Sequence, residues 1–198
     1  VFRQMGYSVE YEFFPWARAM HFAETGERDG TIDWGDTPEF REKFFINKDP
    51  ISPQEFRFFH KKGNAPVWNS LDDLQGKVIG ITSGYVYDNV FTENIKKGNI
   101  RLVEASSDEA NFQKLLSDRI DLFPIERNVG LAILKSRFTP DEQTQIEIDT
   151  KILTIFRPHL LLSKSVPRNI DLIKQFDETF AEIRLSKKYM DLVKSCRQ

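Results

Sequence analysis

The chain has 198 residues and a mass of 23.2 kDa, a size that suits one large domain or two small lobes. Hydrophobic residues make up 40% of the chain, enough for a packed core. The 28 basic and 30 acidic residues are interspersed, and no basic stripe or acidic tail indicates binding to nucleic acid or anionic lipid. The single cysteine, Cys196, excludes an intrachain disulfide and a thiolate metal site. No apolar run approaches the roughly 18 residues of a membrane span.

The first part of the chain alternates strand and helix patterns. It opens abruptly at Val1, so we expect leading sequence to be missing, and the absence of a signal peptide does not indicate a destination. Residues 8–14 alternate aromatic, β-branched and polar side chains, which predicts a strand. Pro15 suits the first turn of a following helix, and Gly26 ends it.

The alternation continues through the middle of the chain. The expected elements are a brief strand at 30–33, an extended segment at 55–62, a helical turn near Leu71, a strand at 77–82, a glycine turn at Gly84, a helix at 87–96, a strand at 100–105 and a helix at 106–118. Ser106 or Ser107 would cap the last helix, because a serine hydroxyl accepts from the first free helical amides.

The carboxylate of Glu126 lies where a predicted buried strand is followed by a predicted helix. Asp121 opens a short apolar run that predicts a strand, the run stops at Pro124, and Glu126 begins a helical pattern. Residues 151–165 then have extended character interrupted by Pro158. The chain ends in helical patterns whose apolar residues recur at spacings of three and four: Ile170, Ile173, Phe176, Phe180, Ile183, Tyr189, Met190 and Val193.

Repeated strand–helix alternation predicts an α/β fold with mainly parallel sheets flanked by helices. Ligands of such open sheets bind outside the carboxyl ends of the strands. The residues just beyond the predicted strands are Pro15-Trp16, Trp34-Gly35, Ser83-Gly84-Tyr85, Glu104-Ala105 and Ile125-Glu126. Aromatic rings, a glycine turn and a carboxylate are therefore expected to share one side of a sheet.

Four segments, residues 6–32, 36–51, 71–84 and 115–130, carry a family resemblance. The third, LDDLQGKVIGITSG, is the most specific, since it is similar to the pattern DLxGKxVGVxxG. In this order and spacing the chain resembles the extracellular solute-binding proteins of family 3, which serve polar amino acid ABC transporters. The likeness runs from Gly6 to about Lys194.

The resemblance implies the two-lobed periplasmic-binding-protein fold. Lobe 1 would contain residues 1–59 and 156–198, lobe 2 would contain residues 60–155, and segments 55–62 and 157–164 would be the crossing strands. The family's first strand would precede Val1. Hinge closure of the lobes around a solute, absorbed by the crossing strands, is the implied mechanism.

In that family the arginine of a Thr-x-Glu-Arg motif clasps the α-carboxylate of an amino acid, because its planar fork gives two parallel hydrogen bonds. Here Thr37 and Glu39 are followed by Phe40, and Arg41 comes one residue late. Arg41 either reaches the ligand through a bulge or is a surface arginine paired with Glu39 or Glu42.

The family's Gly-Thr turn, which binds the same carboxylate, is replaced by Ser83, Gly84 and Tyr85, with Tyr87 close enough to share the role. The alternative is a plain turn with surface tyrosines. Glu126 falls where the family places an aspartate that receives the α-amino group. Its alternative, which does not exclude the first, is stabilisation of a helix N-terminus, worth about 0.3–1 kcal/mol.

Trp16 and Trp34 are candidates to stack on a ligand, although buried tryptophans commonly only pack, and Trp68 is expected to pack. Because two of the three expected amino-acid contacts are altered, an aromatic cleft with one carboxylate favours a cationic or amphipathic solute. His21 and the other two histidines lack metal-ligand spacing, and no phosphate loop, dinucleotide fingerprint or nucleophile elbow occurs. We therefore expect no catalytic residue, metal or cofactor.

The sequence predicts a non-enzymatic, monomeric substrate-binding protein, periplasmic or lipid-anchored outside the cell. Its partners would be a small polar solute and an ABC transporter permease, without nucleic acid or membrane insertion by this chain. The alternatives are an effector domain of a LysR-type regulator, a sensor domain of a membrane kinase, or a module appended to a hydrolytic enzyme. The full reading frame discriminates between them.

Overall fold

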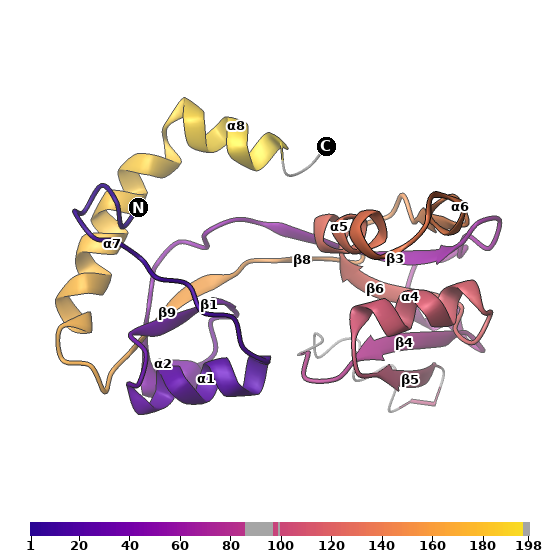
Figure 1. Ribbon diagram of the computed structural model, residues 1–198, viewed down its shortest axis with the longest axis horizontal. Helices are drawn as coiled ribbons and strands as arrows, with labels where there is room; N and C mark the ends of the chain where they lie inside the picture. Colours follow the sequence, from indigo (N-terminus) through magenta and orange to yellow (C-terminus); the bar gives the residue numbers. More distant parts are fainter. Residues whose placement is uncertain (86–96, 99, 196–198) are drawn as a thin grey trace. The chain divides into compact units, whose positions relative to one another are not determined.

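The computed structural model describes residues 1–85, 97–98 and 100–195 (Figure 1). By its internal contacts the chain divides into two compact units. Unit 1 combines Val1–Gln54 with Phe156–Gln198, and unit 2 is Glu55–Ile155. The polypeptide therefore leaves unit 1 once and returns to it once.

Unit 1 is built from a small sheet and flanking helices. Its elements are α1 (Trp16–Thr25), β1 (Gly30–Trp34), α2 (Pro38–Lys43), β2 (Phe44–Ile46), β9 (His159–Ser163), α7 (Asn169–Arg184) and α8 (Lys187–Ser195). The predicted stop of α1 at Gly26 is confirmed, since Gly26 takes the left-handed conformation at φ 79° and its amide donates to the Ala23 carbonyl.

The three strands of unit 1 lie in the order β1-β9-β2, and both pairs are antiparallel. The expectation of a mainly parallel sheet is wrong for these strands, since β9, from the second stretch of unit 1, runs antiparallel to both β1 and β2. Leu160 and Leu162 contribute to a core with Phe176 of α7, whereas Leu161 contributes to a core with Ala23 of α1. Alternation along β9 thus buries both of its faces.

Residues 8–14 do not form the predicted strand. A strand needs a neighbour for its backbone groups, and the described residues supply none to this segment. It is held instead by its side chains: Arg28 donates to both oxygens of Glu12 at 2.7 and 2.9 Å, and the Phe14 ring meets Phe22 edge-on. The rest is open to solvent, with Phe13 92% exposed.

Unit 2 is an α/β layer structure around a larger sheet. Its elements are β3 (Gln54–Lys61), the 3₁₀ turn η1 (Leu71–Leu74), β4 (Val78–Thr82), β5 (Arg101–Ala105), α4 (Asp108–Leu116), β6 (Leu122–Glu126), α5 (Arg127–Arg137), α6 (Pro140–Gln143), β7 (Ile146–Ile148) and β8 (Thr154–Phe156). The chain passes between the units at β3 and β8. Residues 157–164, predicted as the return crossing, instead contain β9 of unit 1.

The sheet of unit 2 has the order β5-β4-β6-β3-β7, and β8 also pairs with β3. β4 lies parallel to β5 and β6, whereas β3 runs antiparallel to β6 and β7. β6 continues through Pro124 to Glu126, beyond the predicted stop. A proline is tolerated there because the register of β6 with β4 is confined to Leu122, so the missing amide of Pro124 breaks no bond on that side.

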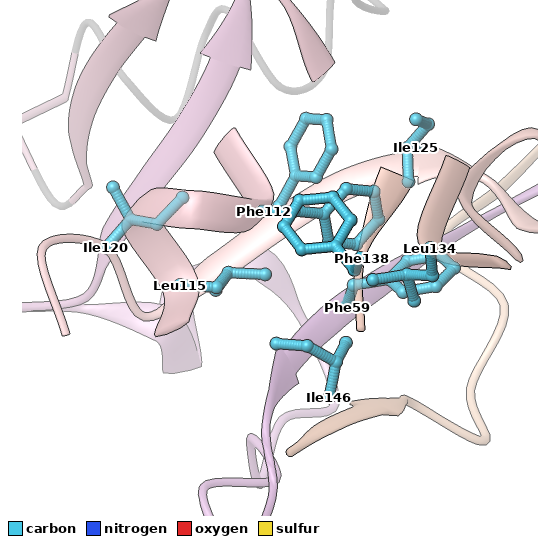
Figure 2. Packing of buried hydrophobic residues seen from close by; sticks show 9 residues of the cluster. Phe59, Phe112, Leu115, Ile120, Ile125, Leu134, Phe138 and Ile146 are labelled. Carbon is cyan, nitrogen blue, oxygen red and sulfur yellow. The ribbon is translucent and has the colours of Figure 1, made fainter. Parts of the chain in front are cut away.

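An aromatic cluster fills the space between this sheet and its helices (Figure 2). Phe112 is fully buried and meets the rings of Phe59 and Phe123 at 5.3 Å and that of Phe138 at 5.8 Å, each edge-on. Edge-on aromatic pairs are favoured because the positive ring edge faces the negative ring face. The cluster holds α4 and α5 against the sheet.

Candidate functional site

The turn after β4 lies at the carboxyl edge of the unit 2 sheet. The Ser83 amide donates to the Ala105 carbonyl at the end of β5 at 2.9 Å, and the Tyr85 amide donates back to the Thr82 carbonyl at 3.2 Å. Gly84 takes φ 82°, a conformation that L side chains rarely adopt. The predicted glycine turn is confirmed, and its backbone ties it to the ends of two neighbouring strands.

The next helix begins beside this turn. Ser107 rather than Ser106 is the N-cap of α4, because its hydroxyl accepts from the Ala110 amide at 3.2 Å. Asp108 then accepts hydrogen bonds from the hydroxyls of Thr82 and Tyr85, both at 2.6 Å. Sequence reasoning missed Asp108, since an acid in a first helical turn is ordinary.

Glu126 ends β6 and is the N-cap of α5. Only 8% of the residue is exposed. One carboxylate oxygen accepts from the Val129 amide at 2.8 Å, and the other accepts from the Asn128 side-chain amide at 3.2 Å. The alternative role at a helix N-terminus is therefore confirmed in geometry, while the role toward a ligand stays a prediction.

The parallel pairing of β4 with β6 brings the turn and Glu126 to the same edge of the sheet. Ile79 of β4 pairs with Leu122 of β6, and the two strands end at Thr82 and Glu126. Because the carboxyl ends of parallel neighbours lie at one edge, residues 83–85 and Glu126 share the edge where ligands of such sheets bind.

Trp34 ends β1 in unit 1 and is enclosed by aromatic rings. Its indole N–H donates to the Thr31 hydroxyl at 2.9 Å, and its ring meets Trp16 at 5.1 Å and Phe40 at 5.6 Å, both edge-on. Both tryptophans are half-buried. Packing within unit 1 thus explains why part of each ring is buried. Stacking of either ring on a ligand stays a prediction.

Asp33, next to Trp34, was not singled out by its sequence pattern. It sits at a bulge in β1 with φ 79°, and its carboxylate accepts from the Gln54 side-chain amide at 2.7 Å. Burial raises the pKa of Asp33, and the hydrogen bond from Gln54 opposes that rise. A half-buried acid on strained backbone at a strand end is the kind of feature that only coordinates reveal.

Thr37 precedes the short helix α2, and Arg41 lies in its last turn. Thr37 is its N-cap and accepts from the Phe40 amide at 3.2 Å. Arg41 is largely exposed and pairs with Asp36, which was not one of the two expected partners, Glu39 and Glu42. Asp36 precedes the cap, where non-helical backbone lets its carboxylate reach the guanidinium. That pairing raises the pKa of Arg41.

Trp68 is confirmed as a packing residue. Its ring meets Phe58 edge-on at 5.6 Å, its N–H donates to Asp149 at 2.6 Å, and the Lys151 ammonium lies 4.2 Å from its ring centre. Tyr87 lies outside the described residues. Within the described ranges no group of three or more metal-ligating side chains could hold an ion, and none of the helices there is both long and apolar enough to cross a membrane.

No family model matches the chain. The L-cystine-binding protein TcyJ of Escherichia coli K12 is 23% identical over 133 residues, which cover 67% of this chain and 49% of TcyJ. An uncharacterized protein of Shewanella oneidensis is 28% identical over 144 residues, or 70% of this chain and 52% of that protein. The chain thus spans about half the length of the curated relatives that it matches.

Solved structures resemble nearly the whole chain. An ancestral arginine-binding protein bound to arginine superposes with a TM-score of 0.74 at 20% identity, covering 96% of this chain and 80% of its own. The chain has the fold of amino acid-binding proteins. The substrate-binding protein AbpA of a Streptococcus pneumoniae amino acid ABC transporter, bound to L-arginine, gives 0.71 at 16% identity, covering 98% of this chain and 78% of its own.

A third similar structure is part of a kinase and not of a transporter. A histidine kinase sensor domain with similarity to periplasmic binding proteins gives a TM-score of 0.75 at 15% identity, covering 98% of this chain and 79% of its own. The predicted fold class and the predicted resemblance are therefore confirmed, because all three neighbours share the periplasmic-binding-protein architecture.

Proposed function

We propose that this chain is the solute-capturing part of a substrate-binding protein for an ABC-type importer. Its solute would be a small polar molecule, an amino acid or a related amine. The fold shared with arginine-binding proteins and the sequence similarity to a cystine-binding protein support this proposal. Capture requires no bond making or breaking, and we propose no enzymatic activity.

One observation carries the proposal. The unit 2 sheet gathers a glycine turn, the aromatic side chain of Tyr85 and the buried carboxylate of Glu126 at its carboxyl edge. Open α/β sheets bind their ligands there, because strand ends and helix N-termini leave polar groups unpaired. The edge thus offers an aromatic ring and a carboxylate acceptor to a polar solute.

In this proposal units 1 and 2 act as the two lobes, with β3 and β8 absorbing the torsions of a hinge. Lobe 1 would contribute Trp16, Trp34, Thr37 and Arg41, and lobe 2 would contribute Ser83, Gly84, Tyr85, Tyr87 and Glu126. Closure would bring the two half-sites onto one solute, and the closed form would dock on a permease. A periplasmic or extracellular location and a monomeric state belong to the same proposal.

Two of these residues would have to exchange or share partners. Arg41 would release Asp36 to clasp a carboxylate, and since exposed ion pairs contribute only about 0–1 kcal/mol, that exchange costs little. Glu126 would keep its capping bonds, because each carboxylate oxygen has two lone pairs and can accept from an ammonium as well. The site therefore needs no rearrangement of unit 2.

The test is a thermal-shift screen of the full-length protein against amino acids, amines and opines. A solute present at a hundredfold excess over its Kd should stabilise the folded protein by about 2.7 kcal/mol. Glu126→Gln should weaken the response to amines, whereas Thr139→Ala, at the cap of remote α6, should leave it unchanged. A protein that no such solute stabilises would not be a solute-binding protein of this kind.

A sensor domain is the second candidate, favoured by the kinase neighbour with its TM-score of 0.75. It would bind a similar solute but signal instead of delivering it. The complete reading frame separates the two: a signal peptide or lipid anchor alone supports import, and a membrane helix followed by a kinase domain supports sensing. A helix-turn-helix would support a LysR-type regulator.

A further inference from the structure

An acid outside the predicted site holds the side chain of Tyr85. Asp108, the first residue of α4, accepts the Tyr85 hydroxyl on one carboxylate oxygen and the Thr82 hydroxyl on the other, each at 2.6 Å. Both oxygens are thus engaged by hydroxyl donors. Hydrogen bonds to an ionised acceptor are shorter and stronger than neutral ones, so the pair is firmly oriented.

The network continues into the core of unit 2. Asn111 is fully buried, and its side-chain amide donates to the Thr82 hydroxyl at 2.9 Å. Asn111 approaches β4 this closely because residue 80 is glycine: a Cβ there would lie 2.6 Å from Asn111 Oδ1 and 2.5 Å from Ile120 Cδ1. The position of Asp108 is therefore set by buried packing as well as by its place on α4.

These bonds determine what the turn can offer to a solute. The Tyr85 hydroxyl donates its hydrogen bond to Asp108, so it is not available to donate to a solute carboxylate. A carboxylate at this turn would also face the charge of Asp108, which takes part in no ion pair among the described residues. A cation would be attracted both by the ring face and by the acid bonded to the ring's hydroxyl.

We infer that Asp108 is a positioning residue that holds the Tyr85 ring, and that the two together select solutes presenting a cation rather than a carboxylate to the turn after β4. The inference rests on the proposed function and names its solute class: amines and guanidines. Asp108 acts through Tyr85 and through its charge, without being required to touch the solute.

The experiment is isothermal titration of the full-length protein with agmatine, L-arginine and L-glutamate. Agmatine is L-arginine without its carboxylate, so the ratio of their Kd values isolates the contribution of that group. We expect agmatine to bind far more tightly than L-glutamate, and any further gain for L-arginine to report its carboxylate at Arg41 of unit 1. Asp108→Asn should reduce the preference for agmatine over L-glutamate about tenfold, equivalent to about 1.4 kcal/mol.

The matched control is Glu109→Gln, which removes the same charge from the same helical turn and should leave the preference unchanged. Loss of stability alone would not alter a ratio of affinities, so the ratio separates positioning from a merely structural role. Tyr85→Phe keeps the ring but loses the bond to Asp108, and it should reduce the preference about threefold, a fraction of one such hydrogen bond. It also carries the test if Asp108→Asn does not fold.

Two results would overturn the inference and leave the proposed function standing. One is a wild-type protein that binds L-glutamate more tightly than agmatine. The other is an unchanged preference in Asp108→Asn, or in Tyr85→Phe where the first variant does not fold. Failure of all three probes and of every other amino acid and amine would overturn the proposed function itself.

Discussion

The candidate site residues of the two units are fixed in different ways. In unit 2, Tyr85 and Glu126 are tied to a sheet edge by hydrogen bonds that lead into a buried core. In unit 1, Trp34 is held by ring contacts and one indole bond, and Arg41 lies in solvent with an acid neighbour. The candidate residues of unit 2 are therefore preformed at a sheet edge, while those of unit 1 include groups that can change partner at low cost.

The sheets explain this difference. Parallel β4, β5 and β6 end at the same edge and bring their following turns together. In unit 1 the described strands are antiparallel, so neighbouring ends carry incoming and outgoing chain alternately. Fewer turns meet at one place, and side-chain packing takes over the positioning.

The largest effect is expected in the core that supports the candidate residues of unit 2. Phe112→Ala should destabilise unit 2 by about 3–5 kcal/mol, because it leaves a cavity among Phe59, Phe123 and Phe138. Phe13→Ala, at a side chain in solvent, should change stability by less than about 0.5 kcal/mol. Urea unfolding of both variants measures the difference in lost stability. Equal losses would show that the aromatic cluster contributes no more to stability than an exposed side chain does.

A smaller effect distinguishes the two roles of Glu126. Glu126→Ala should cost about 1 kcal/mol of stability through loss of the α5 cap. Glu126→Gln retains an oxygen for the Val129 amide and should cost less, yet it should weaken amine binding as much as the alanine variant. Urea unfolding of each preparation measures the role of Glu126 as a helix cap, and titration of the same preparation with an amine measures its role in binding. Binding that follows stability in both variants would assign Glu126 to the cap alone.

The pair at α2 tests how easily unit 1 changes partners. Asp36→Asn should alter stability by no more than about 1 kcal/mol, because the pair is exposed. It should also free Arg41 and strengthen binding of solutes with a carboxylate. Glu39→Gln, in the first turn of α2 and outside the pair, is the control. Titration with L-arginine checks the effect; weaker binding by Asp36→Asn would argue that Asp36 itself serves the site.

The smallest expected effect is a pH dependence at Asp33. Burial raises its pKa above the ordinary aspartate value of about 3.9, so this acid contributes stability that is fully present below that value and lost as the pH rises through the folded-state pKa. Asn resembles the protonated form and tolerates φ 79°. Asp33→Asn should therefore be more stable than wild type at pH 7, with the gap closing below pH 4. Urea unfolding at several pH values measures the stability difference between the two proteins. A difference that grows as the pH falls would contradict a raised pKa of Asp33.

The sequence by itself determined the elements whose causes are local. Gly26 ends α1, a serine caps α4 and the apolar spacing of α7 sets its buried face, since each depends on residues within a few positions. The carboxyl-edge rule also brought Tyr85 and Glu126 to one edge, because parallel strands follow from strand–helix alternation.

Only the tertiary structure decided what depends on distant partners. Residues 8–14 have a strand pattern but no ladder, because a strand is stabilised by a neighbour that its own sequence does not encode. The antiparallel order around β9 pairs strands from the two separate stretches of unit 1. The bond from Tyr85 to Asp108 joins residues 23 positions apart and needs Gly80 and Asn111 to bring α4 onto β4. Local energies fix elements, whereas pairing and close approach across the chain fix the site.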